Sequence, residues 1–193
     1  MDWRAYHAIN RFVVHHAWLG RVFEAIVSYG TILIAVAAFA LWLLARPGSD
    51  RKWKVAAASA LGAAALGLLV NRIISTVWHR DRPYQTHHVA KLWGPHKTDA
   101  SFPSDHASAS FAIAVAVALI DPLVGAAFLV LAVLIAAGRV IIGEHYPTDV
   151  LAGIVVGTAS AYVAVRLARP LILFLVRLVE RGTDPIVGLV RRP

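Results

Sequence analysis

Apolar residues occur along most of this chain in long runs that short polar segments interrupt. A helix rises about 1.5 Å per residue, so roughly 20 apolar residues are needed to cross the hydrocarbon core of a bilayer. Four runs reach or approach that length, and they cover residues 22–45, 55–74, 122–142 and 148–167. The pattern therefore predicts a polytopic membrane protein built from helices.

A fifth run, residues 105–120, is shorter but is counted as a span because its polar start would lie in the interface. Asp121 and Pro122 end it with a tight turn, in which the aspartate caps the next helix and the proline occupies that helix's first position. We thus expect an all-α bundle of about five transmembrane helices, forming a single membrane-embedded domain over residues 1–193.

Both ends of the chain have other patterns. In residues 1–20, Trp3, Tyr6 and Val13 share one helical face while basic and histidine side chains occupy the rest, which is typical of a helix lying in the membrane interface. The apolar stretch within residues 170–193 is too short to span alone. This tail is expected to be either a kinked extension of the last span or a surface helix.

Composition identifies lipid as the solvent of this chain. Of its 193 residues, 59% are hydrophobic and 16% are charged, and its net charge is +8. A soluble domain of this length could not bury so much apolar surface, so we relate the positive charge to cytoplasmic anchoring, anionic headgroups or a phosphate site, and not to nucleic acid. The absence of cysteine excludes disulfides and thiolate chemistry.

Basic residues are concentrated in particular loops. Residues 46–54 read RPGSDRKWK, and the 170–193 tail carries further arginines. Because cytoplasmic loops are enriched in Lys and Arg, both segments are expected in the cytoplasm. The long polar loop over residues 80–104 would then lie on the extracytoplasmic face of the cytoplasmic membrane.

Unusual polar residues stand at span ends that this topology brings to one face. They come from the end of the second span, the start of the third, the end of the fourth and the start of the fifth. Ionisable groups are costly at such positions, which favours a shared functional pocket. The set comprises Arg80, Arg82, Ser104, Asp105, His106, Arg139, His145 and Asp149.

Several of these side chains suit a phosphate group. Arg82 and Arg139 carry planar guanidinium groups that match phosphate oxygens, and two spans direct their N-terminal N–H groups at the pocket. Ser104 can either cap the third span or donate to a phosphate oxygen. For Asp105, helix capping and substrate contact are both open.

Two histidines are candidates for the chemistry. Asp149 lies in the first turn after Pro147 and can reach one ring nitrogen of His145, which would orient the other nitrogen as a nucleophile. His106 can then donate a proton to the leaving oxygen. This arrangement suits phosphoryl transfer through a phosphohistidine.

Other polar residues have simpler interpretations. Arg139 could extend to lipid headgroups, and Glu144 is interpreted as a carboxylate that faces solvent or headgroups. The spacing of His87, His88 and His96 matches no common metal site. We therefore expect neither a metal nor another cofactor.

Three segments, in this order, resemble the signature motifs of the type-2 phosphatidate phosphatase superfamily of membrane lipid phosphatases. They are Arg82-Pro83, PSDH at residues 103–106 and GRVIIGEHYPTD at residues 138–149. The lead-in DASFPSDHAS and the short chain look most like the bacterial undecaprenyl-diphosphate phosphatase branch. The resemblance implies a metal-independent hydrolase that converts undecaprenyl or another polyprenyl diphosphate to the monophosphate and supports recycling of the cell-wall lipid carrier.

The same resemblance implies roles for individual residues. His145 would be the nucleophile, Asp149 its orienting partner and His106 the general acid, while Arg82, Arg139 and Ser104 would hold the phosphate. The expected partners are a phosphorylated lipid and the bilayer, with no nucleic acid.

The chain departs from the family pattern at two positions. Ser75 stands where the first motif usually has a lysine, and we favour Arg80 as the replacement, with Arg72 as the second candidate. Gly138 stands where the third motif usually has a serine. Two other functions are kept as alternatives: a phosphatase for phosphatidate, phosphatidylglycerophosphate or another lipid monophosphate, and a non-catalytic membrane scaffold or lipid-binding bundle.

The predicted orientation can be tested with reporter domains. A reporter fused after residue 193 should read cytoplasmic, and one inserted near residue 91 should read external, because the basic loop and tail are expected to stay in the cytoplasm. The reverse pattern of reporter activity would place the pocket on the cytoplasmic face.

Overall fold

The structure is a computed structural model that describes residues 2–45, 51–89 and 92–190, with side chains up to residue 184. The predicted 80–104 loop and 170–193 tail therefore include residues, 90–91 and 191–193, that lie outside this description. The described chain is helical. Its elements are α1 (Asp2–His15), α2 (Ala17–Leu44), α3 (Lys52–Val77), α4 (Pro83–Thr86), α5 (Asp105–Ala118), α6 (Pro122–Ile141), α7 (Pro147–Tyr162), the π-helical segment η1 (Val163–Leu167) and α8 (Arg169–Val190).

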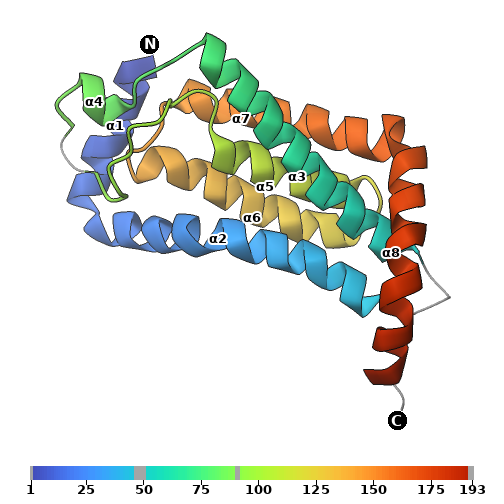
Figure 1. Cartoon of the computed structure of the whole chain (residues 1–193). Helices are drawn as coiled ribbons and strands as arrows, with labels where there is room; N and C mark the ends of the chain where they lie inside the picture. The colour runs from blue at the N-terminus through green and yellow to red at the C-terminus, as the bar shows by residue number, and fades with distance from the viewer. Residues whose placement is uncertain (1, 46–50, 90–91, 191–193) are drawn as a thin grey trace.

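Four helices are long and apolar enough to cross a bilayer, which confirms the predicted all-α membrane bundle. They are α2, α3, α6 and α7 continued by η1. The fifth predicted span, α5, has 14 residues and rises only about 21 Å. It packs against α3, α6 and α7 and also touches α2, so the shortest apolar helix forms the centre of the bundle (Figure 1).

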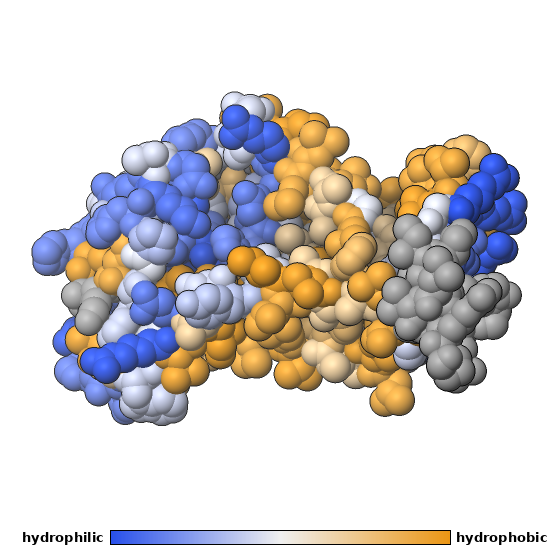
Figure 2. Space-filling view, turned by 60° about the horizontal axis from the view of Figure 1, so that its bottom comes forward, coloured by the Kyte–Doolittle hydropathy of each residue, from blue (hydrophilic) through white to orange (hydrophobic). Residues whose placement is uncertain are grey.

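The surface is divided as a membrane protein requires. Apolar side chains form a belt over the middle of the molecule, whereas polar side chains gather at the end that carries α1 and α4 (Figure 2). Large side chains in the belt, such as Leu33, Val130 and Val155, are more than half exposed. In a bilayer these outward faces meet lipid, which accounts for apolar residues that water would not tolerate in such number.

Two glycines of α7 allow it to lie directly against α5. A Cβ atom on Gly157 would lie 2.3 Å from the carbonyl oxygen of Ser108, and one on Gly153 would lie 2.6 Å from the carbonyl oxygen of Ser104. Neither position can accept a side chain without separating the two backbones. The N–H group of Ser104 donates to the carbonyl of Asp149 at 3.0 Å, so this close packing fixes the starts of α5 and α7 side by side.

The turn before α6 has the predicted structure. Asp121 precedes Pro122, and its carboxylate accepts a hydrogen bond from the N–H group of Val124 at 3.2 Å. The helix therefore begins at the proline, as the Asp-Pro pair indicates.

The first and last helices, α1 and α8, lie at opposite ends of the bundle (Figure 1). Helix α1 packs on α6 and α7, and the Tyr6 hydroxyl donates to the Gly143 carbonyl at 3.1 Å. The tail forms a separate helix, α8, which follows the π-helical segment and crosses the far end. Lys54 joins it to α3 through Glu180 at 3.3 Å and Asp184 at 2.6 Å.

Candidate active site

Four helix ends meet at the polar end of the bundle, where the sequence predicts a pocket. His145 lies in the turn that joins α6 to α7. Gly143 permits this turn with a φ of 92°, a value that side chains disfavour. The N–H groups of Glu144 and His145 both donate to the carbonyl of Arg139, so His145 is placed directly beside the end of α6.

The ring of His145 is held at both nitrogens. Nδ1 lies 2.8 Å from the carbonyl oxygen of Ser101, an acceptor that requires the proton to be on Nδ1. Nε2 then carries a lone pair and lies 3.0 Å from a terminal nitrogen of Arg139 and 3.2 Å from one of Arg82. The lone pair therefore faces the two guanidinium groups and accepts their hydrogen bonds.

The surroundings also keep this ring uncharged. Burial lowers the pKa of His145 well below its usual value, and the positive charges of Arg139 and Arg82 lower it further. The side chain is only 2% exposed. A neutral imidazole with a free Nε2 is the form that can act as a nucleophile.

Asp149 is linked to His145 through Ser101. Its carboxylate lies 3.7 Å from Nδ1 of His145, too far for a hydrogen bond. It accepts instead from the Ser101 hydroxyl at 2.5 Å and from the N–H group of Tyr146 at 2.9 Å. Ser101, which the sequence analysis did not identify, thus holds the histidine with its carbonyl and the aspartate with its hydroxyl.

The two arginines form a buried cradle beside Nε2. Arg82 is 3% exposed and bonds to Asp99 through both its Nε, which donates to the carbonyl at 3.3 Å, and a terminal nitrogen, which donates to the carboxylate at 3.0 Å. Arg139 is 1% exposed, and within the described part of the chain its Nε has no hydrogen-bond partner. Together they provide donors suited to phosphate oxygens.

Ser104 and His106 lie at the N-terminal end of α5. Ser104 is fully buried, its hydroxyl does not cap α5, and it has no partner among the described residues. Buried hydroxyls are normally paired, so this hydroxyl is available to a ligand, whereas the capping alternative is not observed. His106 is half-buried and lines a cavity of about 260 Å³ together with Arg139.

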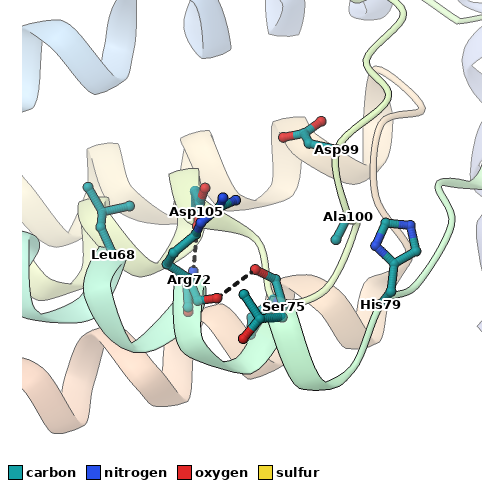
Figure 3. A pocket seen from close by; sticks show the side chains of 10 residues that line it. Leu68, Arg72, Ser75, His79, Asp99, Ala100 and Asp105 are labelled. Atoms are coloured by element: carbon teal, nitrogen blue, oxygen red, sulfur yellow. Dashed lines mark hydrogen bonds between the residues drawn. The ribbon is translucent and has the colours of Figure 1, made fainter.

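Asp105 points away from this cradle. It accepts a hydrogen bond from Asn71 at 2.8 Å and lines a separate groove of about 410 Å³ between α3 and the segment 99–105. Figure 3 shows Arg72 and Ser75 in the same groove. The Asp105 side chain therefore faces a different groove from the cavity that His106 lines.

Arg80 is occupied by carboxylates. Its guanidinium group lies 2.7 Å from Asp149 and 2.6 Å from Asp2, donates to Thr148 at 2.8 Å and stacks over the ring of Tyr146 at 4.0 Å. These contacts tie α1 to the start of α7. They direct Arg80 away from the cradle.

Glu144 corrects one sequence interpretation. We expected it to face solvent or headgroups, but it is 1% exposed and pairs with Arg139, with further cations at 3.5 Å (Arg82) and 3.6 Å (Lys97). Glu144 can be buried because Arg139, Arg82 and Lys97 balance its negative charge, which would otherwise keep the carboxylate at the surface. Gly94 leaves the room for it, since a Cβ there would lie 2.2 Å from its carboxylate.

The loop histidines take part in ring contacts. His87 stacks on Trp3 with ring centroids 3.9 Å apart, and His96 meets Tyr84 edge-on at 5.2 Å. Within the described ranges, no group of three or more His, Cys, Asp or Glu side chains could hold a metal ion. Metal independence stays a prediction for experiment.

Comparisons with known proteins agree with this geometry. Residues 56–172 match the family model described as the PAP2 superfamily. The chain is 32% identical to undecaprenyl-diphosphatase BcrC of Bacillus subtilis (strain 168), over 93% of this chain and 92% of the relative. It is 35% identical to decaprenylphosphoryl-5-phosphoribose phosphatase of Mycolicibacterium smegmatis, over 61% of each. The crystal structure of Aquifex aeolicus LpxE superposes with a TM-score of 0.70 at 21% identity and covers 86% of this chain and 94% of that one.

The substitution Glu144→Gln tests whether this carboxylate balances the cradle. It keeps the side-chain size but leaves Arg82 and Arg139 without their shared counter-charge, so we expect the free energy of unfolding to fall by about 3 kcal/mol. Orthovanadate, a phosphate analogue, should raise the thermal midpoint more in this variant than in wild type, because the oxyanion substitutes for the missing charge.

Glu24→Gln is the matched control, since Glu24 is an exposed carboxylate on the rim of the same cavity. It should leave the midpoint and the vanadate response unchanged. Equal midpoints and equal vanadate shifts for Glu144→Gln and wild type would contradict the role given to Glu144.

Proposed function

The chain belongs to the PAP2 superfamily of membrane lipid phosphatases, and from this premise we propose that it hydrolyses polyprenyl diphosphates such as undecaprenyl diphosphate. The products are the lipid monophosphate and inorganic phosphate. The observation that carries the proposal is the neutral His145, whose Nε2 faces two buried arginines.

In the proposed reaction, Nε2 of His145 attacks the terminal phosphorus atom. The bond between that phosphorus and the bridging oxygen breaks, and His106, which enters this step protonated, gives its proton to the leaving oxygen, which departs with the lipid monophosphate. Water, deprotonated by His106, then attacks the phosphohistidine and releases inorganic phosphate. Both histidines return to their starting states.

The other residues of the site bind the phosphate group and orient the His145 ring. Arg82, Arg139, the Ser104 hydroxyl and the N-terminal N–H groups of α5 bind the phosphate oxygens and stabilise the charge of the transition state. The Ser101 carbonyl keeps the proton on Nδ1 of His145, and Asp149 holds Ser101 in place. No step requires a metal ion.

The preference for a polyprenyl diphosphate rests on similarity along nearly the whole chain to a protein named as an undecaprenyl diphosphatase. Apolar faces of the bundle give a long isoprenoid tail access from the bilayer. With the pocket on the extracytoplasmic face of the cytoplasmic membrane, the reaction would recycle a cell-wall lipid carrier.

A second candidate keeps the mechanism and changes the substrate to a lipid monophosphate. It is favoured by the similarity to a phosphatase whose name specifies a decaprenylphosphoryl sugar phosphate, although that match covers 61% of this chain. Side-by-side turnover of undecaprenyl diphosphate and phosphatidate separates the two candidates.

The substitution His145→Ala tests the proposed reaction. Purified protein carrying it should release no phosphate from undecaprenyl diphosphate, because the substitution removes the imidazole whose Nε2 lone pair faces Arg82 and Arg139. His88→Ala, an exposed histidine in the same loop region, should keep wild-type turnover as the matched control. Wild-type activity should also persist in EDTA.

Normal turnover by His145→Ala would refute the assignment of the nucleophile. Loss of wild-type activity in EDTA would refute metal independence. If wild type acts on none of these lipids and forms no covalent phosphoenzyme, the scaffold interpretation is correct instead.

A further inference from the structure

A third cation stands at the mouth of the cradle, on the loop that precedes α5. Lys97 lines the cavity that also contains His106, Arg139 and Glu144. It is 33% exposed at the side chain, whereas the two arginines are at most 3% exposed. Lys97 therefore lies nearer the opening than the groups that surround His145.

The backbone of Lys97 is held from both sides. Its N–H group donates to the Tyr84 hydroxyl at 2.8 Å, and its carbonyl accepts from that hydroxyl at 3.0 Å and from the Gln85 amide at 3.2 Å. Tyr84 and Gln85 belong to α4, which begins directly after Arg82. Lys97 is thus anchored to the same short segment that positions a cradle arginine.

The side chain of Lys97 is directed into the site. Its Nζ lies 3.6 Å from the carboxylate of Glu144, which pairs with Arg139 beside the nucleophile. Its positive charge also contributes to lowering the pKa of His145. A lysine placed in this way can reach a ligand in the cavity while its stem stays fixed.

Other candidate cations are placed elsewhere. Arg80 is bound by Asp2 and Asp149, and Arg72 lies in the groove beyond Asp105, where Ser75 donates to the Arg72 carbonyl (Figure 3). Among the described residues, Lys97 and Arg139 are the Lys and Arg side chains that line the cavity. Lys97 is therefore the one available to the part of a substrate that lies outside the cradle.

The direction of nucleophilic attack determines which part of the substrate lies outside the cradle. His145 attacks from the buried side, so the leaving oxygen of an in-line displacement points toward the cavity with His106 and Lys97. In a diphosphate this oxygen carries a second, negatively charged phosphate. In a phosphomonoester the leaving oxygen is bonded to an uncharged alkyl group and departs as an alcohol.

We propose that Lys97 binds the leaving phosphate of a lipid diphosphate and thereby selects diphosphates over phosphomonoesters. The proposal rests on the phosphatase function proposed above and names the substrate class of that site. Lys97 also offsets Glu144, a carboxylate lining the cavity that would otherwise repel a second phosphate.

The test compares Lys97→Met with wild type on two substrates, undecaprenyl diphosphate and phosphatidate. Methionine keeps an unbranched stem and removes the charge. We expect kcat/KM to fall roughly 30-fold for the diphosphate, the effect of losing one hydrogen bond to a charged group, and less than about threefold for phosphatidate. Lys97→Arg should restore most of the diphosphate activity.

Arg11→Met is the matched control and should leave both activities unchanged, because Arg11 is an exposed side chain of α1 outside the cavity that Lys97 lines. Inhibition provides an independent measurement: Lys97→Met should weaken inhibition of phosphatidate hydrolysis by inorganic diphosphate but not by orthophosphate. An equal loss for both substrates, or no loss for either, would overturn the role of Lys97.

These outcomes are distinct from failure of the proposed function. If wild type hydrolyses neither lipid, or if His145→Ala keeps full activity, the phosphatase mechanism itself is wrong. If wild type is active and depends on His145 but Lys97→Met lacks the substrate-dependent effect, only the selection of diphosphates is wrong.

Discussion

The hydrogen bond from Nδ1 of His145 to the Ser101 carbonyl determines what this site can do. It assigns the proton to one ring nitrogen and directs the lone pair of the other at Arg82 and Arg139. A carbonyl is a suitable partner because it only accepts, so the ring cannot reverse its tautomer without losing the bond. Asp149 supports this contact because it accepts a hydrogen bond from the Ser101 hydroxyl. The close packing of α5 on α7 fixes the starts of these two helices relative to each other.

Two cationic side chains are buried beside the neutral imidazole, and their burial carries a desolvation cost that other residues must offset. Arg82 and Arg139 are nearly inaccessible to water, and buried charges are stable only when paired. Glu144 and Asp99 provide the pairing in the protein alone. In the proposed function, a phosphate group offers the same guanidinium groups additional negative oxygens.

Much of the architecture could be predicted from the sequence because each span is marked by its own apolar run, and successive spans cross the bilayer in alternating directions. They bring Arg82, His106 and His145 to one end of the bundle. Side-chain partners across the fold could not be predicted in this way. Arg80 is drawn to Asp2, 78 residues away, and Glu144 is buried only because Lys97 and two arginines approach it. Lys97 and Ser101 lie on irregular backbone, where no periodicity marks which residues face a site.

The atom of the enzyme that accepts the phosphoryl group can be identified by trapping the covalent intermediate. Wild-type protein mixed with substrate, quenched under alkaline conditions and digested can be analysed by mass spectrometry and phosphorus NMR for the modified residue and its isomer. We expect phosphate on Nε2 of His145, because Nδ1 is held by the Ser101 carbonyl. Phosphate on Nδ1 of that ring, or on His106, would contradict this expectation.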